Sequence, residues 1–114
     1  MDVQFQIQAG VGVVTVSGAL TVSTVDRFRD PTVRWLAANG AVKNVVLDLG
    51  AVDNIDSTAL GAILSLLKRV GDRGGDLKIA RLLQPKPRLL FEITRAHKVF
   101  EIFDTAEEAL RACA

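Results

Sequence analysis

Residues 45–61 read VVLDLGAVDNIDSTALG, and this segment indicates the fold class. Its first part, Val45–Leu49, is almost continuously apolar, which is typical of a short strand that other elements cover on both faces. Its last part begins a run of aliphatic residues at helical spacing, which predicts an amphipathic helix to about Val70. A buried strand that leads into such a helix is the building unit of α/β proteins, so we expect that class.

The segment between this strand and this helix, Gly50–Ile55, is predicted to be a loop. The helix is then expected to begin at Asp56 or Ser57, because both residue types are favoured helix caps. The apolar stripe of the helix consists of Leu60, Ile63, Leu64, Leu67 and Val70.

Two strands and a helix are predicted before this stretch. Over residues 3–7, apolar side chains alternate with glutamines, which is the period of a strand with one buried face. The β-branched run over residues 11–17 predicts a second strand, which forms a hairpin with the first and ends at Gly18. Helical spacing follows over residues 23–38, with a kink or a break into two helices expected at Pro31, because proline removes an amide donor.

Capping residues mark the ends of two helices. Ser23 or Thr24 can cap the helix that precedes the stop signal Asn39–Gly40. Near the C-terminus, Thr105–Glu108 matches a capping box and predicts a last helix to about Ala112.

Three more elements are predicted between the second helix and the last one. Asp76–Arg81 reads as a strand, Pro85–Pro87 leads into a short helix, and Val99–Phe103 resembles a short edge strand. The apolar residues of the short helix are Leu89, Leu90 and Ile93.

The element order therefore predicts one α/β domain over residues 1–114, with a mixed sheet of four to five strands and about four covering helices. The chain has 114 residues, 49% of them hydrophobic, which suits one domain with one core. One cysteine, Cys113, and one histidine, His97, exclude a disulfide framework and a standard zinc site, so no metal or cofactor is expected.

Charge and hydropathy limit the classes of partner and the cellular location that we expect. Fourteen basic and 13 acidic residues leave a net charge of +1, which gives no general field for nucleic acid or an anionic bilayer. The apolar runs are shorter than the roughly 18 residues that a membrane span needs, so no direct membrane insertion is expected. The N-terminus lacks the features of a secretory signal, which makes the cytoplasm the expected location.

One segment has the character of a site. Asp53–Gly61 lies between the buried strand and the amphipathic helix, where α/β sheets usually place function. A helix start carries free amides and partial positive charge, so a hydroxyl there is well placed to become a phosphate. A purely structural interpretation stays open, because Asp, Ser and Thr in this position are also ordinary helix caps.

Asp56–Gly61, after the strand Val45–Leu49, resembles the D-S-[ST]-G-L-G signature of STAS domains, the family of anti-sigma factor antagonists. Three further segments resemble the same family in order and spacing. They are Gly74–Ile79, the helix Arg88–Phe91 and the C-terminal segment Phe100–Leu110. The likeness spans essentially the whole chain, and its specificity comes from the combination of these pieces.

The resemblance implies a protein-binding switch in bacterial transcription control, which is not itself an enzyme. It implies that an anti-sigma factor that is also a serine kinase binds the unmodified chain and releases it after phosphorylation, and that a phosphatase resets the switch. Ser57 takes the place of the phosphorylated residue, with Thr58 as second choice. The residues expected to contact the partner are Thr21, Asp53, Asp56, Ser57, Thr58, Leu60 and Gly61.

The chain departs from the family pattern at two places. Ala19 and Thr21 stand where the family usually has acidic residues, one of which helps to contact the kinase, so the kinase pairing is in question. Ala59 replaces a usual glycine, which costs little in a helix because alanine is the best helix former.

The sequence also leaves other functions open. The missing acids favour a STAS subunit that regulates a phospholipid-transporting ABC complex, or a scaffold component of a stress-sensing assembly. A small-ligand or nucleotide-binding module that uses the loop Gly50–Asp56 stays open. A triad of Ser57 and His97 with an aspartate lacks a nucleophile elbow, so His97 is interpreted as a surface residue. The basic residues Lys86, Arg88, Arg95 and Lys98 lack interleaved aromatics and are interpreted as a solvated face.

Overall fold

The computed structural model describes residues 1–113 and shows a single α/β domain with a five-stranded mixed sheet. The spatial order β1-β2-β3-β4-β5 follows the chain; β1 and β2 are antiparallel and all other neighbours are parallel. The strands are β1 (Asp2–Gln8), β2 (Val11–Leu20), β3 (Val45–Ile55), β4 (Leu77–Ala80) and β5 (Ile102–Phe103).

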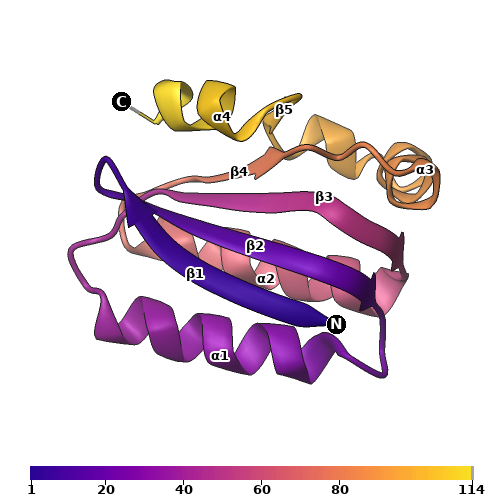
Figure 1. The fold of residues 1–114 in the computed structure, drawn as a ribbon, viewed down its shortest axis with the longest axis horizontal. Helices are drawn as coiled ribbons and strands as arrows, with labels where there is room; N and C mark the ends of the chain where they lie inside the picture. The colour runs from indigo at the N-terminus through magenta and orange to yellow at the C-terminus, as the bar shows by residue number, and fades with distance from the viewer. Residues whose placement is uncertain (114) are drawn as a thin grey trace.

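Helices cover both faces of this sheet, with α1 and α2 on one side and α4 on the other (Figure 1). The predicted order of strands and helices is confirmed, with one added 3-10 turn, η1. The helical elements are α1 (Val25–Ala38), α2 (Ser57–Asp72), α3 (Pro85–Ile93), η1 (Ala96–Lys98) and α4 (Ala106–Ala112).

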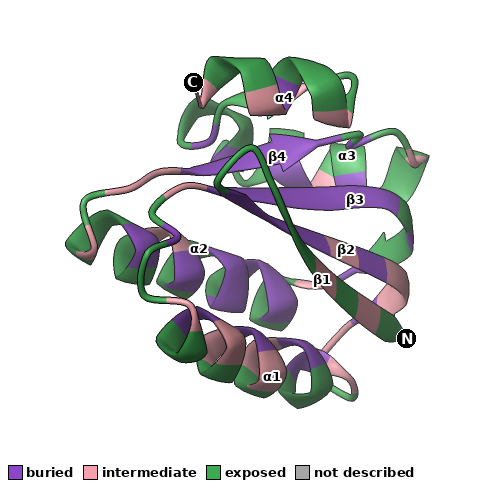
Figure 2. Ribbon diagram, turned by 60° about the vertical axis from the view of Figure 1, so that its left-hand side comes forward, coloured by how far each residue is buried: buried purple, intermediate pink, exposed green. Residues whose placement is uncertain are grey.

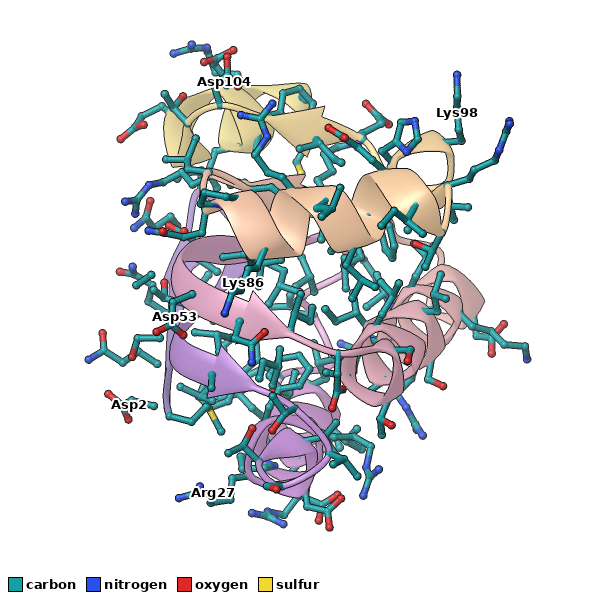
Figure 3. All side chains as sticks on the ribbon, turned by 90° about the vertical axis from the view of Figure 1, so that its right-hand side faces the viewer. Asp2, Arg27, Asp53, Lys86, Lys98 and Asp104 are labelled. Atoms are coloured by element: carbon teal, nitrogen blue, oxygen red, sulfur yellow. The ribbon has the colours of Figure 1, made fainter. Side chains whose placement is uncertain are left out.

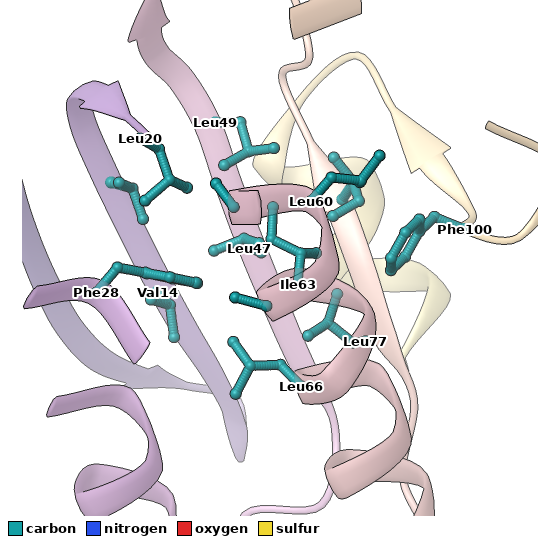
Figure 4. Packing of buried hydrophobic residues seen from close by; sticks show 14 of the residues in the cluster. Val14, Leu20, Phe28, Leu47, Leu49, Leu60, Ile63, Leu66, Leu77 and Phe100 are labelled. Carbon is teal, nitrogen blue, oxygen red and sulfur yellow. The ribbon is translucent and has the colours of Figure 1, made fainter. Parts of the chain in front are cut away.

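The main core lies between the sheet and the pair α1 and α2. Phe28, Leu47 and Ile63 are at most 1% exposed and interdigitate across this layer (Figure 4). The buried face of α2 turns toward the sheet (Figure 2) and includes Leu60, Ile63 and Val70 of the predicted stripe. One predicted member is wrong, because Leu64 is exposed and Leu66 is buried instead.

Strand β3 is longer than predicted, and the prediction of a loop over Gly50–Ile55 is wrong. These residues continue the strand beside β2, with two register shifts in which β3 carries an extra residue relative to β2. The first shift falls between Asp48 and Ala51, and the second places Asp53 in the bulge. A bulge breaks the alternation that sequence patterns detect, which explains the misreading.

Strand β2 also runs on past its predicted end. Gly18 has a φ of +89°, and the strand continues through it to Leu20. Glycine adopts this conformation without a steric penalty, so it serves here as an irregular strand position and not as a terminator.

Helix α1 is one continuous helix with Pro31 inside, so of the two outcomes predicted at this proline, a kink or a break into two helices, the break does not occur. The lost backbone bond is tolerated because Phe28 and Leu36, on either side of the proline, are both anchored in the core.

The C-terminus of α1 is closed by a side chain from a distant part of the sequence. The helix stops at Asn39 as predicted, yet Gly40 is not among the glycines with positive φ. Instead, the Arg73 guanidinium donates hydrogen bonds to the carbonyl oxygens of Leu36 (2.6 Å), Asn39 (2.8 Å) and Val42 (2.5 Å). A cation at this position also suits the negative end of the helix dipole.

The predictions for the two short helices, α3 and α4, are confirmed only in part. The capping box is confirmed, because the Thr105 hydroxyl accepts the Glu108 amide at 3.1 Å and donates to its carboxylate at 3.0 Å. In α3, however, the predicted apolar residues Leu89 and Ile93 are exposed, and Phe91 enters the core instead.

Candidate functional site

The ends of two strands, the start of a helix and a turn meet around the segment Asp53–Gly61. Strands β2 and β3 end side by side, with Ala19 opposite Asn54 and Leu20 opposite Ile55. Helix α2 begins directly after β3, and the turn that leads into α1 begins directly after β2. Figure 3 looks onto this end of the molecule and shows Asp53 at its surface.

The Asp56 carboxylate joins two of these elements. One oxygen, Oδ1, accepts the amide of Ala59 at 2.9 Å and so caps α2. The other oxygen, Oδ2, accepts the amide of Val22 at 2.8 Å, in the turn before α1. Asp56 therefore caps a helix and also fixes the turn beside it, which goes beyond the purely local cap that the sequence allowed.

These hydrogen bonds favour the ionised form of Asp56. The Ala59 amide, opposed by partial burial and assisted by the Val22 amide, holds the pKa of the Asp56 carboxyl below its ordinary value. The side chain is thus an anion at neutral pH, and it contributes its charge to the surface next to Ser57.

The depressed pKa of Asp56 predicts a pH dependence of stability. The stabilisation from Asp56 is complete above the unfolded-state value of about 3.9 and is lost as pH falls through the lower folded-state pKa. We expect the free energy of unfolding to drop more steeply over this acidic range in the wild type than in Asp56→Asn, which keeps an acceptor oxygen but cannot titrate. Urea unfolding from neutral pH to about pH 2.5 measures both slopes. Equal slopes for the two proteins would contradict the predicted contribution of Asp56 ionisation to stability.

Ser57 and Thr58 occupy the first two positions of α2, and both side chains are exposed. Asp53 is exposed too, and it lies in the bulge of β3, where the extra residue redirects side chains out of the regular alternation. Two hydroxyls and two carboxylates are therefore grouped at the start of one helix.

The predicted contact residue Thr21 belongs to the turn held by Asp56. Its carbonyl accepts the amides of Thr24 and Val25, and its own amide donates to the Thr24 hydroxyl at 2.9 Å. The Thr24 hydroxyl donates in turn to the carbonyl of Ala19 at 2.8 Å, so the expected helix-capping bond of Thr24 is replaced by bonds within this turn. Thr21 is half-buried and lies close to the Asp56 clamp.

Val22 is a surface residue that the sequence did not single out. Its side chain is 65% exposed although its amide is bound to Asp56, which places an apolar group beside the start of α2. A lone valine in a predicted turn carries no sequence signal, and only the long-range hydrogen bond identifies it.

The last two predicted contact residues differ in their surroundings. Leu60 is 4% exposed and belongs to the core, so its side chain anchors α2 and does not face a partner. Gly61 is exposed, and a Cβ added to it would meet no atom within 4 Å. The fold therefore does not require glycine at this position.

Features outside this segment have structural explanations. His97 lies in η1, and its Nδ1 is 3.0 Å from the carbonyl oxygen of Phe91. Two buried charged residues, Asp48 and Lys78, are paired: Asp48 with Arg81 at 3.3 Å, and Lys78 with carboxylates at 3.1 and 2.9 Å. Within residues 1–113, no helix combines the length and the apolar character needed to cross a bilayer.

The chain is similar to known proteins over most of its length. The STAS domain family model matches residues 2–109 of the chain. The anti-sigma F factor antagonist of Paenibacillus polymyxa is 27% identical over 110 residues, which cover 96% of this chain and 92% of that protein.

Solved structures share the architecture. An anti-sigma factor antagonist from Mycobacterium paratuberculosis has a TM-score of 0.83 and 24% identity, over 98% of this chain and 92% of that one. The Bacillus cell fate determinant SpoIIAA in its phosphorylated form has a TM-score of 0.72 and 19% identity, over 99% and 100%. At these identities the likeness establishes the fold alone.

Proposed function

The chain belongs to the STAS domain family, and we propose that it is an anti-sigma factor antagonist, a single STAS domain over residues 1–114 that acts as a switch. Unmodified, it binds an anti-sigma factor that is also a serine kinase, and so frees a sigma factor for transcription. Phosphorylation of Ser57 by that kinase ends the binding, and a phosphatase restores it. The proposed location is the cytoplasm, and the proposed role is regulatory, without catalysis.

The placement of Ser57 carries this proposal. Its side chain is exposed on the first residue of α2, immediately after the Asp56 cap, within the region that matches the family. Together with Asp53, Thr58, Gly61 and the turn at Thr21, it makes up the proposed partner surface, to which we add the exposed side chain of Val22.

A phosphate on Ser57 would present its charge to a partner and leave the fold intact. The Asp56 side chain already occupies the Ala59 amide, and the Asp56 carbonyl accepts the Leu60 amide at 3.0 Å. The added charge of about −1.5 to −2 would lie beside the Asp56 carboxylate on an exposed surface. Like charges brought together at an interface cost several kcal/mol, so the modification would act on docking.

Phosphate mapping tests the proposal. We expect incubation with the anti-sigma factor kinase of the source organism and ATP to modify Ser57, detected by mass spectrometry. Ser57→Ala should remain unmodified, and Thr58→Ala should be modified like the wild type. Modification of Thr58 alone would move the site by one residue, and modification outside Asp53–Gly61 would overturn the mechanism.

A second candidate keeps the fold and changes the partner. The lack of acidic residues at Ala19 and Thr21 favours a STAS subunit of a phospholipid-transporting ABC complex or of a stress-sensing scaffold. Ala19 lies near the end of β2 and pairs with Asn54 of β3, so this departure lies within the sheet and not in a free loop. Affinity capture from the native cell separates the two candidates, because it recovers either a serine kinase or an ABC ATPase.

A further inference from the structure

Helix α3 and the segments beside it carry most of the large apolar side chains that the described residues leave exposed. Five of the eight large apolar side chains that the described residues leave exposed come from residues 83–102. We call them the α3 surface: Leu83 (48% exposed), Leu89 (55%), Ile93 (69%), Val99 (57%) and Ile102 (36%). Such a concentration in one short segment marks an interaction site more often than scattered apolar residues do.

The α3 surface is hollowed. A hollow of about 200 Å³ lies between α3 and β5, with Leu82, Phe91 and Ile102 among its apolar walls. A second, shallower hollow runs on past Leu89, and the two share Leu83, Arg88 and Glu92, so they form one groove. The first hollow has room for one apolar side chain, because about 150 Å³ already holds a benzene ring, and the second, of about 400 Å³, is more open.

Basic residues outnumber unpaired acidic ones around this groove. Residues 83–104 contain four basic residues, Lys86, Arg88, Arg95 and Lys98, against three acidic residues, Glu92, Glu101 and Asp104, of which Glu101 is paired with Lys78. Arg88, Glu92 and Asp104 line the groove itself. All four basic residues are exposed, and no ion pair between residues of the described chain involves them. Lys86 lies near one end of α3 and Lys98 beyond the other (Figure 3). Four unpaired cations against two unpaired carboxylates leave an excess of positive charge around the apolar side chains, which is complementary to an acidic amphipathic segment.

We propose that the α3 surface is a second docking site, which binds an acidic amphipathic helix of a partner protein. One apolar side chain of that helix enters the hollow beside Phe91, its neighbours cover Leu89 and Ile93, and its carboxylates pair with the basic residues. This site is distinct from the proposed surface at Ser57, so phosphorylation there leaves it available. The partner class follows from charge and shape, and it does not depend on the proposed antagonist function.

A designed peptide tests this proposal. The probe has about 18 residues, long enough to be partly helical, with leucines at positions i, i+3, i+4 and i+7 and glutamates elsewhere. We expect NMR titration of the ¹⁵N-labelled chain to shift resonances of residues 83–102, with a Kd of about 1 mM or lower. The same peptide with lysine in place of glutamate should bind at least about tenfold more weakly.

Matched variants assign the contacts. Leu89→Ser and Arg88→Glu should each weaken binding at least about tenfold, since truncated or reversed interface residues have effects of this size. The controls Ile7→Ser and Arg27→Glu change an exposed apolar residue and an exposed cation elsewhere, and should bind like the wild type, as should Ser57→Asp.

Four outcomes would overturn the proposal. They are resonance shifts outside residues 83–102, equal binding of the lysine peptide, concentration-dependent self-association through the α3 surface, and binding to anionic phosphatidylserine vesicles in preference to the peptide.

Discussion

Ser57→Asp is expected to weaken binding to the anti-sigma factor at least tenfold, which corresponds to about 1.4 kcal/mol or more. The substitution places a fixed carboxylate next to Asp56, whose two oxygens are already bound to the Ala59 and Val22 amides and cannot move away. The folded state should not suffer, because an acidic residue in the first turn of α2 interacts favourably with the helix dipole. Calorimetric titration of the purified partner measures the loss.

Two neutral variants separate charge from contact. Ser57→Asn has nearly the shape of aspartate without the charge, and Ser57→Ala removes the hydroxyl. Both should bind within about threefold of the wild type, and the deficit of Ser57→Asp should shrink as salt screens the charge. Because Asp56 and not Ser57 is the helix cap, alanine should also leave stability within about 0.5 kcal/mol. Equal losses in all three folded variants would mean that the hydroxyl itself is a contact and that charge is irrelevant.

The parts of the fold that the sequence predicted are those with regular periodicity. Val45–Leu49 and the α2 pattern predicted the central strand and helix, and from them the class and element order. Irregular positions were misread. The bulges of β3 and the positive φ of Gly18 break the period of two, so a continuing strand looked like a loop. The Arg73 closure of α1 joins residues more than thirty positions apart in sequence, which no local pattern detects.

The candidate site, too, could be predicted from the sequence only in part. Capping rules predicted that Asp56 or its neighbour begins α2, and the structure assigns the cap to Asp56. The helical period also made Leu60 a core residue, although its place in the motif suggested a contact. The bond from Asp56 to the Val22 amide spans 34 positions, so its role in fixing the adjoining turn required the fold. The sequence predicted Leu89 and Ile93 as apolar residues of α3 and the basic residues around them as a solvated face, and the exposure of Leu89 and Ile93 changes that interpretation.

Gly75→Ala is expected to cost about 3 kcal/mol or more of unfolding free energy, the upper range for an overpacked site. A Cβ at this position would lie 1.7 Å from the carbonyl oxygen of Lys43 and 2.3 Å from its carbonyl carbon. Both atoms are backbone, so the clash cannot be relieved by a rotamer change. The segment cannot retreat either, because the adjacent residue, Asp76, donates its amide to the Asn44 side chain and accepts the Val45 amide, each at 2.9 Å.

Gly61→Ala is the matched control, because the same added methyl would meet no atom within 4 Å in a helical segment. It should stabilise the fold by about 0.5 to 1 kcal/mol, the difference in helix propensity between the two residues. Urea unfolding followed by circular dichroism measures both variants, and thermal unfolding replaces it if Gly75→Ala is too unstable in urea. A loss below about 1 kcal/mol for Gly75→Ala would mean that the chain before β3 yields, and that the close approach of the two backbones is not what requires glycine.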